Sequence, residues 1–400
     1  MSERVRFPGA EAELAGRIDH PQGPPRGWAL FAHCFTCGKD LAAARRIADA
    51  LAQRGFGVLR FDFTGLGQSE GEFADTTFSS NVADLVAAAD FLRREHAAPK
   101  VLIGHSLGGA AVLAAAQAIE EVRAVATIGA PFQPAHLTHL IESQAPELRE
   151  AGQAEVKLGP RSFTLRAGFL TDLEEQNQPE RIAALQRALL ILHAPADEIV
   201  PVDEARKIYQ AARHPKSFVS LDDADHLLSR RADAEYAAEV IATWSARYLP
   251  ELPGPAPEEQ GVVRVEGGPA GFANAVVAGK HLLRADEPRS VGGTDTGPAP
   301  YDFLLAGLGA CTSMTLRMYA DRKGWPLEGV SVRLRHEKIH AEDCADCETK
   351  SGRLDRIERE LVLRGPLDQE QRERLLEIAD RCPVHRTLEG EIRVETRLSE

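Results

Sequence analysis

Three features common in membrane, secreted or nucleic-acid-binding proteins are missing from this sequence. It has no long hydrophobic run: its most apolar stretches, such as residues 109–118, are short and rich in alanine, so no membrane span is expected. The first residues contain no apolar signal-peptide core, and we therefore expect a cytoplasmic protein. Basic charge is not in excess. The net charge of −13 argues against a nucleic-acid or anionic-membrane partner.

Cysteine is also scarce relative to the length. A chain of 400 residues predicts two domains, and 44% hydrophobic with 27% charged residues is typical of globular proteins. In a long cytosolic chain, the few cysteines are expected to be reduced, catalytic or metal-binding rather than a disulfide framework. They are Cys34, Cys37, Cys311, Cys344, Cys347 and Cys382.

Residues 1–250 alternate between short apolar runs and helical patterns. The alternation predicts βαβ units and a mostly parallel sheet with helices on both faces. One interval, about 134–178, is long, polar and weakly periodic, which favours a substrate lid. The expected strands are 27–33, 57–63, 100–104, 122–129, 188–193 and 217–221, and the expected helices are 41–54, 81–95, 107–118, 202–213 and 232–248.

A segment dense in proline, glycine and glutamate, residues 251–260, predicts an extended linker. The second domain, residues 261–400, is expected to be α+β, in contrast to the first. Its helices are expected at 301–323, entered through Pro300, and at 368–381, where Asp368 and Gln371 form a box-like cap. Its strands are expected within 261–283 and at 329–340, 361–364 and 391–398.

A serine lies between a predicted strand and a predicted helix, in the sequence Gly104-His-Ser106-Leu-Gly108. This is the context that a G-x-S-x-G nucleophile elbow requires. Serine needs a base, and the base needs a carboxylate to hold its tautomer. In the chain order of such folds the acid and the histidine follow the serine, and Asp197 and His226 each follow a strand. The rival acids are Asp225, Asp223 and, less favoured, Glu198.

The expected oxyanion hole consists of two backbone N–H groups. One belongs to Leu107, directly after the serine, and the other to Phe35, in the loop after the strand that ends near His33.

Residues 1–250 resemble the α/β-hydrolase superfamily in this elbow and in the turn Asp62-x-x-Gly65-x-Gly67-x-Ser69. The resemblance implies hydrolysis of a small-molecule acyl substrate, an ester, thioester or amide, with no cofactor required. It gives Asp62 a structural role. Cys34 is a departure, because many members have glycine there. The rival hypothesis is a catalytically silent scaffold.

Two cysteines of the second domain, Cys311 within an apolar helix and Cys382 before Pro383, could meet only through the fold. Composition alone favours buried structural cysteines. Both segments resemble the OsmC family, which includes organic hydroperoxide reductases. The resemblance implies a peroxidatic Cys311, a resolving Cys382, an external dithiol reductant and a homodimer formed through this domain.

The activating residues depart from the family pattern. Peroxide-reducing relatives have glutamate ten positions before the first cysteine, where this chain has Tyr301. No motif marks the arginine that would lower the thiol pKa; Arg284 and Arg289 are candidates by position. The alternative is a non-catalytic binding or dimerisation module.

A further group of potential ligands comprises His336 and His340, four apart on one strand face, followed by Cys344 and Cys347. These are tetrahedral zinc ligand types. The competing interpretations are a redox-active dithiol and solvent-facing residues.

Overall fold

The computed structural model describes residues 2–21, 25–34, 38–158, 161–249, 258–267, 271–340 and 353–398. The chain is divided into two compact units. We call Met1–Val265 with Val277–His281 the N-terminal unit, and Glu266–Val276 with Leu282–Glu400 the C-terminal unit. Within the described ranges no helix is long and apolar enough to cross a membrane.

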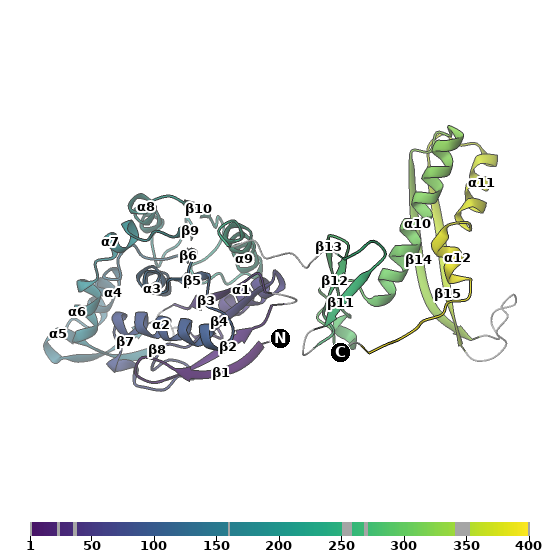
Figure 1. Ribbon diagram of the computed structural model, residues 1–400. Coiled ribbons are helices and arrows are strands. Elements are labelled where there is room, and N and C mark those ends of the chain that lie inside the picture. Colours follow the sequence, from purple (N-terminus) through teal and green to yellow (C-terminus); the bar gives the residue numbers. More distant parts are fainter. Residues whose placement is uncertain are drawn as a thin grey trace. The chain divides into compact units, whose positions relative to one another are not determined.

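An eight-stranded sheet forms the centre of the N-terminal unit (Figure 1). Its order is β1-β2-β4-β3-β5-β6-β9-β10. The β1–β2 and β2–β4 pairs are antiparallel, and every pair from β4 to β10 is parallel, which confirms the predicted mostly parallel sheet. The strands are β1 (Ser2–Pro8), β2 (Glu13–Asp19), β3 (Gly27–Ala32), β4 (Phe56–Phe61), β5 (Val101–His105), β6 (Ala124–Ile128), β9 (Ala188–His193) and β10 (Lys216–Ser220).

Helices cover both faces of this sheet, and each predicted helix is present. The predicted helices are α1 (Ala42–Gln53), α2 (Phe78–Glu95), α3 (Leu107–Ala115), α8 (Val202–Ala211) and α9 (Arg231–Ala246), and a 3₁₀ helix, η1 (Phe73–Asp75), precedes α2. The interval predicted as a weakly periodic lid contains ordered elements. These are α4 (His136–Gln144), α5 (Leu148–Ala151), the hairpin β7 (Gln153–Leu158) and β8 (Arg161–Arg166), α6 (Ala167–Glu175) and the start of α7 (Gln178–Ala183). Its role as a lid stays a prediction.

Successive strand residues point to opposite faces and so build two separate cores. In β3, Leu30 joins the core formed with α2 and α3, whereas Ala29 and Phe31 join the core formed with α1 and α9. The interval between β6 and α7 contributes to the first core, with Ile141 and Phe169 among its buried residues. Burial on both faces explains why these strands read as continuous apolar runs.

The order of the strands reverses beside β3. From β3 the chain moves through α1 to β4 on one side, and then through α2 to β5 on the other. Open α/β sheets bind ligands beyond the carboxyl ends of their strands at such a switch point. The residue after β5 is Ser106.

The C-terminal unit centres on one long helix. After the last helix of the N-terminal unit the chain forms a three-stranded sheet, β11 (Val263–Gly267), β12 (Asn274–Ala278) and β13 (His281–Ala285). The C-terminal unit includes a two-stranded antiparallel sheet, β14 (Gly329–His340) and β15 (Arg353–Arg364). Its helices are η2 (Arg289–Val291), α10 (Pro300–Lys323), α11 (Gln369–Ala379) and α12 (Pro383–Leu388). Pro300 is the first residue of α10, and the Asp368–Gln371 capping box opens α11, both as predicted.

One strand prediction in this unit was too short, and another was wrong. The predicted strand 361–364 is only the end of the twelve-residue β15. The first part of β15 alternates but is rich in charged residues, so the sequence did not indicate a strand there. Residues 391–398, predicted as a strand, have no regular structure. They are almost fully exposed, and no partner strand is available to them within the described residues.

A buried ion pair supports the structural role that was expected of the Asp62 turn. Lys39 Nζ lies 2.6 Å from Asp62 Oδ2, and both side chains are almost completely buried. The backbone N–H groups of Lys39 and Gln68 also donate to this carboxylate, at 2.7 and 2.9 Å. Gly67 (φ +56°) abuts it so closely that any Cβ would clash with Asp62. The carboxylate therefore ties the loop after β3 to the loop after β4.

We predict that Asp62→Ala lowers the free energy of unfolding by up to about 3–5 kcal/mol, because it removes the closest carboxylate from the buried Lys39 ammonium and leaves only Asp40 at 3.6 Å and the Gln68 amide. Chemical denaturation measures this loss. The double variant Lys39→Met/Asp62→Ala should recover part of it. Asp203→Ala, which breaks an exposed ion pair with Arg206, should cost less than about 1 kcal/mol. A double variant no more stable than Asp62→Ala would contradict the prediction.

Candidate active site

Ser106 occupies a sharp turn between β5 and α3, as the sequence predicts. Its backbone angles, φ +56° and ψ −127°, lie in a region that side-chain-bearing residues seldom adopt. The Ser106 N–H donates to the carbonyl of Ile128 at 2.8 Å, which ties the turn to the end of β6. This strained strand-to-helix turn is the conformation that exposes a serine hydroxyl at the head of a sheet.

The glycines around Ser106 are required by close backbone contacts. A Cβ at Gly104 would clash with the carbonyl of Gly108, and one at Gly109 would lie 2.5 Å from the Ala130 side chain. A Cβ at Gly108 would clash with the carbonyls of Ala32 and His33. The start of α3 therefore packs directly against the end of β3. Leu107, predicted to supply one oxyanion-hole N–H, is buried in this contact, whereas Phe35, the predicted second donor, lies outside the described residues.

Asp197 and His226 are joined by a hydrogen bond. Asp197 Oδ2 accepts from His226 Nδ1 at 2.7 Å, and Asp197 Oδ1 accepts from the N–H groups of Ile199 and Val200, both at 2.9 Å. Burial pushes the pKa of Asp197 upward, but the hydrogen bonds from His226 and from the backbone outweigh it, and the pKa lies below its usual value. The carboxylate is thus ionised, and it fixes the proton on Nδ1 of the imidazole.

The rival Asp225 is engaged elsewhere. Its Oδ1 accepts from the N–H of Ser229 at 2.8 Å, within its own loop. The acid that contacts the histidine is therefore the one favoured from the sequence. A neutral imidazole held in this way can accept a proton at Nε2.

Contacts on both sides of Ser106 hold His226 near the serine. Gly129 follows Ile128, whose carbonyl binds the Ser106 N–H, and a Cβ at Gly129 would lie 3.3 Å from both Asp197 Oδ2 and His226 Nδ1. His105, directly before the serine, donates from Nε2 to the carbonyl of His226 at 2.6 Å. The structure thus gathers Ser106, Asp197 and His226 at the carboxyl ends of β5, β9 and β10.

Three buried histidines at this edge of the sheet were not singled out from the sequence. His33 follows β3, His105 ends β5 and His193 ends β9. Burial lowers the pKa of each imidazole, that of His105 to about 4. Their rings are therefore neutral near pH 7. No sequence signal separates them from solvent-facing loop histidines, because only the register of the strands buries them.

Cys34 corrects the expectation that all cysteines are reduced, because it takes part in a disulfide bond. Its side chain is buried directly after His33. Cys37 lies outside the described residues.

In the C-terminal unit the two predicted thiol segments meet. Both Cys311, half-buried in α10, and Cys382, fully buried before α12, are free thiols. Cys382 Sγ accepts from the N–H of His385 at 3.3 Å, and the hydroxyl of Thr312 lies 3.7 Å from it. The residue after Cys311 therefore contacts Cys382, although the two segments are about seventy residues apart in sequence.

Arg359, which no motif marked, contacts Thr312, the residue after Cys311. Its guanidinium donates to the Thr312 hydroxyl at 3.2 Å and to the carbonyl of Ala379 at 3.1 Å. The candidates chosen by position lie in β13 (Arg284) and η2 (Arg289). Only the pairing of β15 with β14 brings residue 359 to this place, so sequence spacing could not reveal it.

Tyr301, at the position where relatives have glutamate, stacks on His336 with ring centroids 4.2 Å apart. His336 Nε2 also contacts Asp355 Oδ1 at 2.8 Å. Cys344, Cys347 and the side chain of His340 lie outside the described residues, and among the side chains that are described no group of three or more potential ligands could hold a metal. The zinc hypothesis stays untested.

Each unit is similar to proteins of a known family. Residues 24–175 match the family described as serine aminopeptidase, S33, and residues 293–397 match the OsmC-like proteins. The solved structure of an esterase domain from a Rhodothermus marinus protein is 47% identical. The match covers 62% of this chain and 99% of that one, with a TM-score of 0.52.

The curated relatives are more distant. YfhR of Salmonella typhi, an uncharacterized protein, is 27% identical over 208 residues, or 51% of this chain and 66% of that protein. The mitochondrial palmitoyl-protein thioesterase ABHD10 of mouse is 26% identical over 187 residues, covering 45% of this chain and 62% of that protein. The chain thus spans just under two thirds of the length of these relatives.

We predict that acid weakens the fold through the buried histidines. Each has a folded-state pKa below the unfolded value of about 6.5, so below that pH the unfolded chain binds more protons, and for His105 this holds down to about pH 4. The stabilisation is fully present above pH 6.5 and is lost as the pH falls. The share of His105 is about 3 kcal/mol.

Denaturant unfolding at several pH values tests this. His105→Gln, which cannot take up the proton, should show a shallower decline between pH 6.5 and 4 than the unsubstituted protein. Parallel stability curves for the two proteins would contradict the assignment.

Proposed function

The chain belongs to the α/β-hydrolases through its N-terminal unit and has an OsmC-like domain in its C-terminal unit, and from this we propose that the N-terminal unit is a serine hydrolase. It acts by acyl transfer on an ester, thioester or amide of a small-molecule acyl substrate. The observation that carries the proposal is the Asp197–His226 hydrogen bond of 2.7 Å beside the strained turn at Ser106. A catalytically silent scaffold would not require this pairing of acid and histidine.

Acylation begins when His226 Nε2 takes the Ser106 proton while Oγ attacks the acyl carbon. Asp197 stays ionised and stabilises the imidazolium that forms, in line with its lowered pKa. His226 then gives the proton to the leaving alcohol, thiol or amine. The acyl group remains on Ser106 until water, activated by the same imidazole, releases it as the acid.

The negative charge that develops on the acyl oxygen requires hydrogen-bond donors. We assign this role to the backbone N–H of Leu107, at the first position of α3, and to that of Phe35. The packing of Gly108 against the end of β3 supports the pairing, because it brings the start of α3 to the His33 carbonyl, two residues before Phe35 in the sequence.

Esters and thioesters are the favoured substrates. The R. marinus relative is described as an esterase domain, and the mouse relative as a palmitoyl-protein thioesterase. We propose that the interval 134–178 selects the acyl group, and that the enzyme works in the cytoplasm.

We predict that Ser106→Ala abolishes labelling by a fluorophosphonate probe and lowers kcat on a p-nitrophenyl ester by about 10⁴- to 10⁶-fold. Asp197→Asn should lower kcat by about 10⁴-fold, because it loses the carboxylate that holds the imidazole.

The matched control is Asp225→Asn, in the adjacent loop, which should retain activity. Equal losses in Asp225→Asn and Asp197→Asn would contradict the assignment of the acid. An unlabelled serine in the unsubstituted protein would favour the scaffold hypothesis.

For the C-terminal unit we propose thiol-dependent reduction of organic hydroperoxides, supported by the Thr312–Cys382 contact. The Cys311 thiolate attacks the peroxide, the O–O bond breaks, and an alcohol and a cysteine sulfenic acid form. The Cys382 thiol displaces water to give a disulfide, which an external dithiol reduces. The hydrogen bond from Arg359 to the Thr312 hydroxyl helps to hold α10 beside Cys382. The alternative is a non-catalytic binding or dimerisation module.

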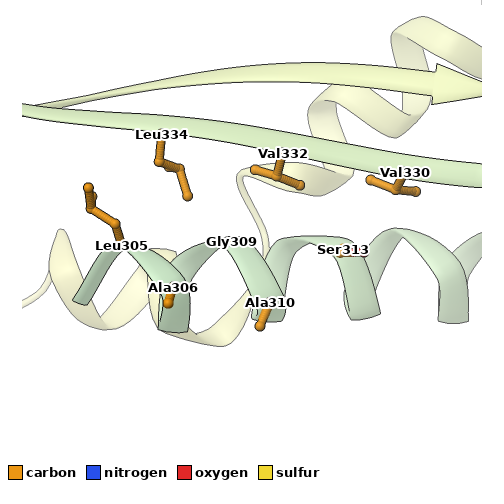
Figure 2. Close-up of a pocket in the computed structure, with 8 residues that line it drawn as sticks. All are labelled: Leu305, Ala306, Gly309, Ala310, Ser313, Val330, Val332 and Leu334. Atoms are coloured by element: carbon orange, nitrogen blue, oxygen red, sulfur yellow. The ribbon is translucent and has the colours of Figure 1, made fainter. Parts of the chain in front are cut away.

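A homodimer through this unit is also proposed. An apolar groove of about 360 Å³ lies between α10 and β14. Figure 2 shows Val330, Val332 and Leu334 of β14 directed toward α10, with Leu305 rising toward Leu334. Met314 and Met318 of α10 are 65% and 72% exposed. The core of this unit is small, so burying these surfaces against a second copy would stabilise it.

We predict that one equivalent of cumene hydroperoxide converts the reduced protein to a Cys311–Cys382 disulfide, as detected by peptide mass spectrometry. Cys311→Ser should block this reaction, and Arg359→Gln should slow it, because the variant loses the hydrogen bond to Thr312, the residue that contacts Cys382.

The control is Arg333→Gln, an exposed arginine on β14, which should react at the original rate. Thiols that survive the peroxide unchanged would rule out the activity and leave the binding module as the explanation.

A further inference from the structure

Two of the buried histidines are paired with the backbone of the loops that contain the proposed base and acid. His105 ends β5 and His193 ends β9, and their side chains are 4% and 0% exposed. Neither takes part in the acyl-transfer steps above. Each donates one hydrogen bond to a backbone carbonyl: His105 Nε2 to His226 O at 2.6 Å, and His193 Nε2 to Val200 O at 2.8 Å.

The carbonyl bound by His105 belongs to the proposed base itself. The two imidazole rings also pack together, with centroids 5.1 Å apart. Since His105 is covalently joined to Ser106, this hydrogen bond fixes the loop of the base to the residue beside the proposed nucleophile. Rotation or retreat of the His226 backbone would have to break it.

The carbonyl bound by His193 belongs to the loop of the acid. Val200 donates its own N–H to Asp197 Oδ1 at 2.9 Å, so His193, Val200 and Asp197 form a connected chain of hydrogen bonds. His193 Nε2 also lies 3.6 Å from Asp197 Oδ2. The imidazole therefore lies near the Oδ2 atom of the carboxylate, whereas the backbone N–H groups bind Oδ1.

Both hydrogen bonds need a proton on Nε2, because a carbonyl oxygen can only accept. Burial lowers the pKa of both imidazoles and keeps them neutral near pH 7. His193 Nδ1 is buried with no hydrogen-bond partner within the described residues. An apolar side chain would fill the same space without this unfavourable burial, which indicates that the Nε2–H donor is the useful feature.

We propose that His105 and His193 are positioning residues of the N-terminal active site. They act as neutral Nε2–H donors that hold the loops of His226 and Asp197 in the geometry of acyl transfer. The inference rests on the proposed hydrolase function, and it concerns reactivity of the assembled site rather than substrate binding.

The test compares substitutions that keep or remove the donor. Glutamine places an N–H group near the position of His Nε2, whereas leucine has similar bulk and no donor. We expect His105→Leu and His193→Leu to lower kcat on a p-nitrophenyl ester by about 10²-fold, the size expected for a small misplacement of reacting groups. KM and Tm should change little, and the glutamine variants should stay within a few-fold of the original kcat.

The control pair is His281→Leu and His281→Gln, at an exposed histidine of β13, which should leave kcat unchanged. If a leucine variant does not fold, asparagine replaces it, because its shorter side chain retains an amide that cannot reach the carbonyl. Leucine or asparagine variants with the original kcat would overturn the proposal. Equal losses of kcat in the glutamine and donor-free variants would also overturn it.

A second measurement does not depend on activity. The downfield proton resonance of the His226–Asp197 hydrogen bond should be present in the unsubstituted protein and in the glutamine variants, and lost or broadened in the donor-free variants. If the resonance follows this pattern while the unsubstituted protein neither hydrolyses esters nor reacts with a fluorophosphonate, the positioning role stands and the proposed hydrolase function fails. An unchanged resonance in the donor-free variants would overturn the positioning role.

Discussion

The direct contact between the start of α3 and the end of β3 is the constraint on which the N-terminal site depends. Glycine at 104, 108 and 109 lets the turn after β5 fold so tightly that no Cβ fits within it. The same contact forces Ser106 into its unusual backbone angles and aligns its N–H with the end of β6. Gly129 and His226 can then approach from the other side. Without this close approach of backbones, the three site residues would lie at the same sheet edge but not together.

The local sequence was enough to predict the features that depend only on neighbouring residues. The elbow at Ser106, the acid and the histidine each follow an apolar strand, and the caps at Pro300 and Asp368 need only a few neighbouring residues. What depends on pairing between distant segments could not be predicted. Arg359 reaches Thr312 because β15 pairs with β14 over its whole length. The antiparallel strands β1 and β2 were missed, because they are more polar than the strands of the parallel core.

The failed prediction at 391–398 has the same origin. Its alternating pattern suits a strand, but a strand needs a partner for its backbone, and none of the described segments supplies one. The buried histidines show the converse case. His193 ends a predicted strand and His105 directly follows one, but nothing in the sequence marks them as buried. Only the packing of neighbouring strand ends turns them into neutral internal donors. Burial and partner geometry are therefore the information that composition and spacing lack.

The position of the interval between β6 and β9 has a consequence for how this protein could diversify. The two strands pair directly with each other in parallel register, so the chain leaves the sheet after Ile128 and returns beside the same strand at Ala188. The intervening helices and hairpin can be lengthened, shortened or exchanged while the strand pairs that support Ser106 and Asp197 stay intact. Changes confined to this interval can therefore alter which substrates the protein accepts, while the reactive groups stay the same.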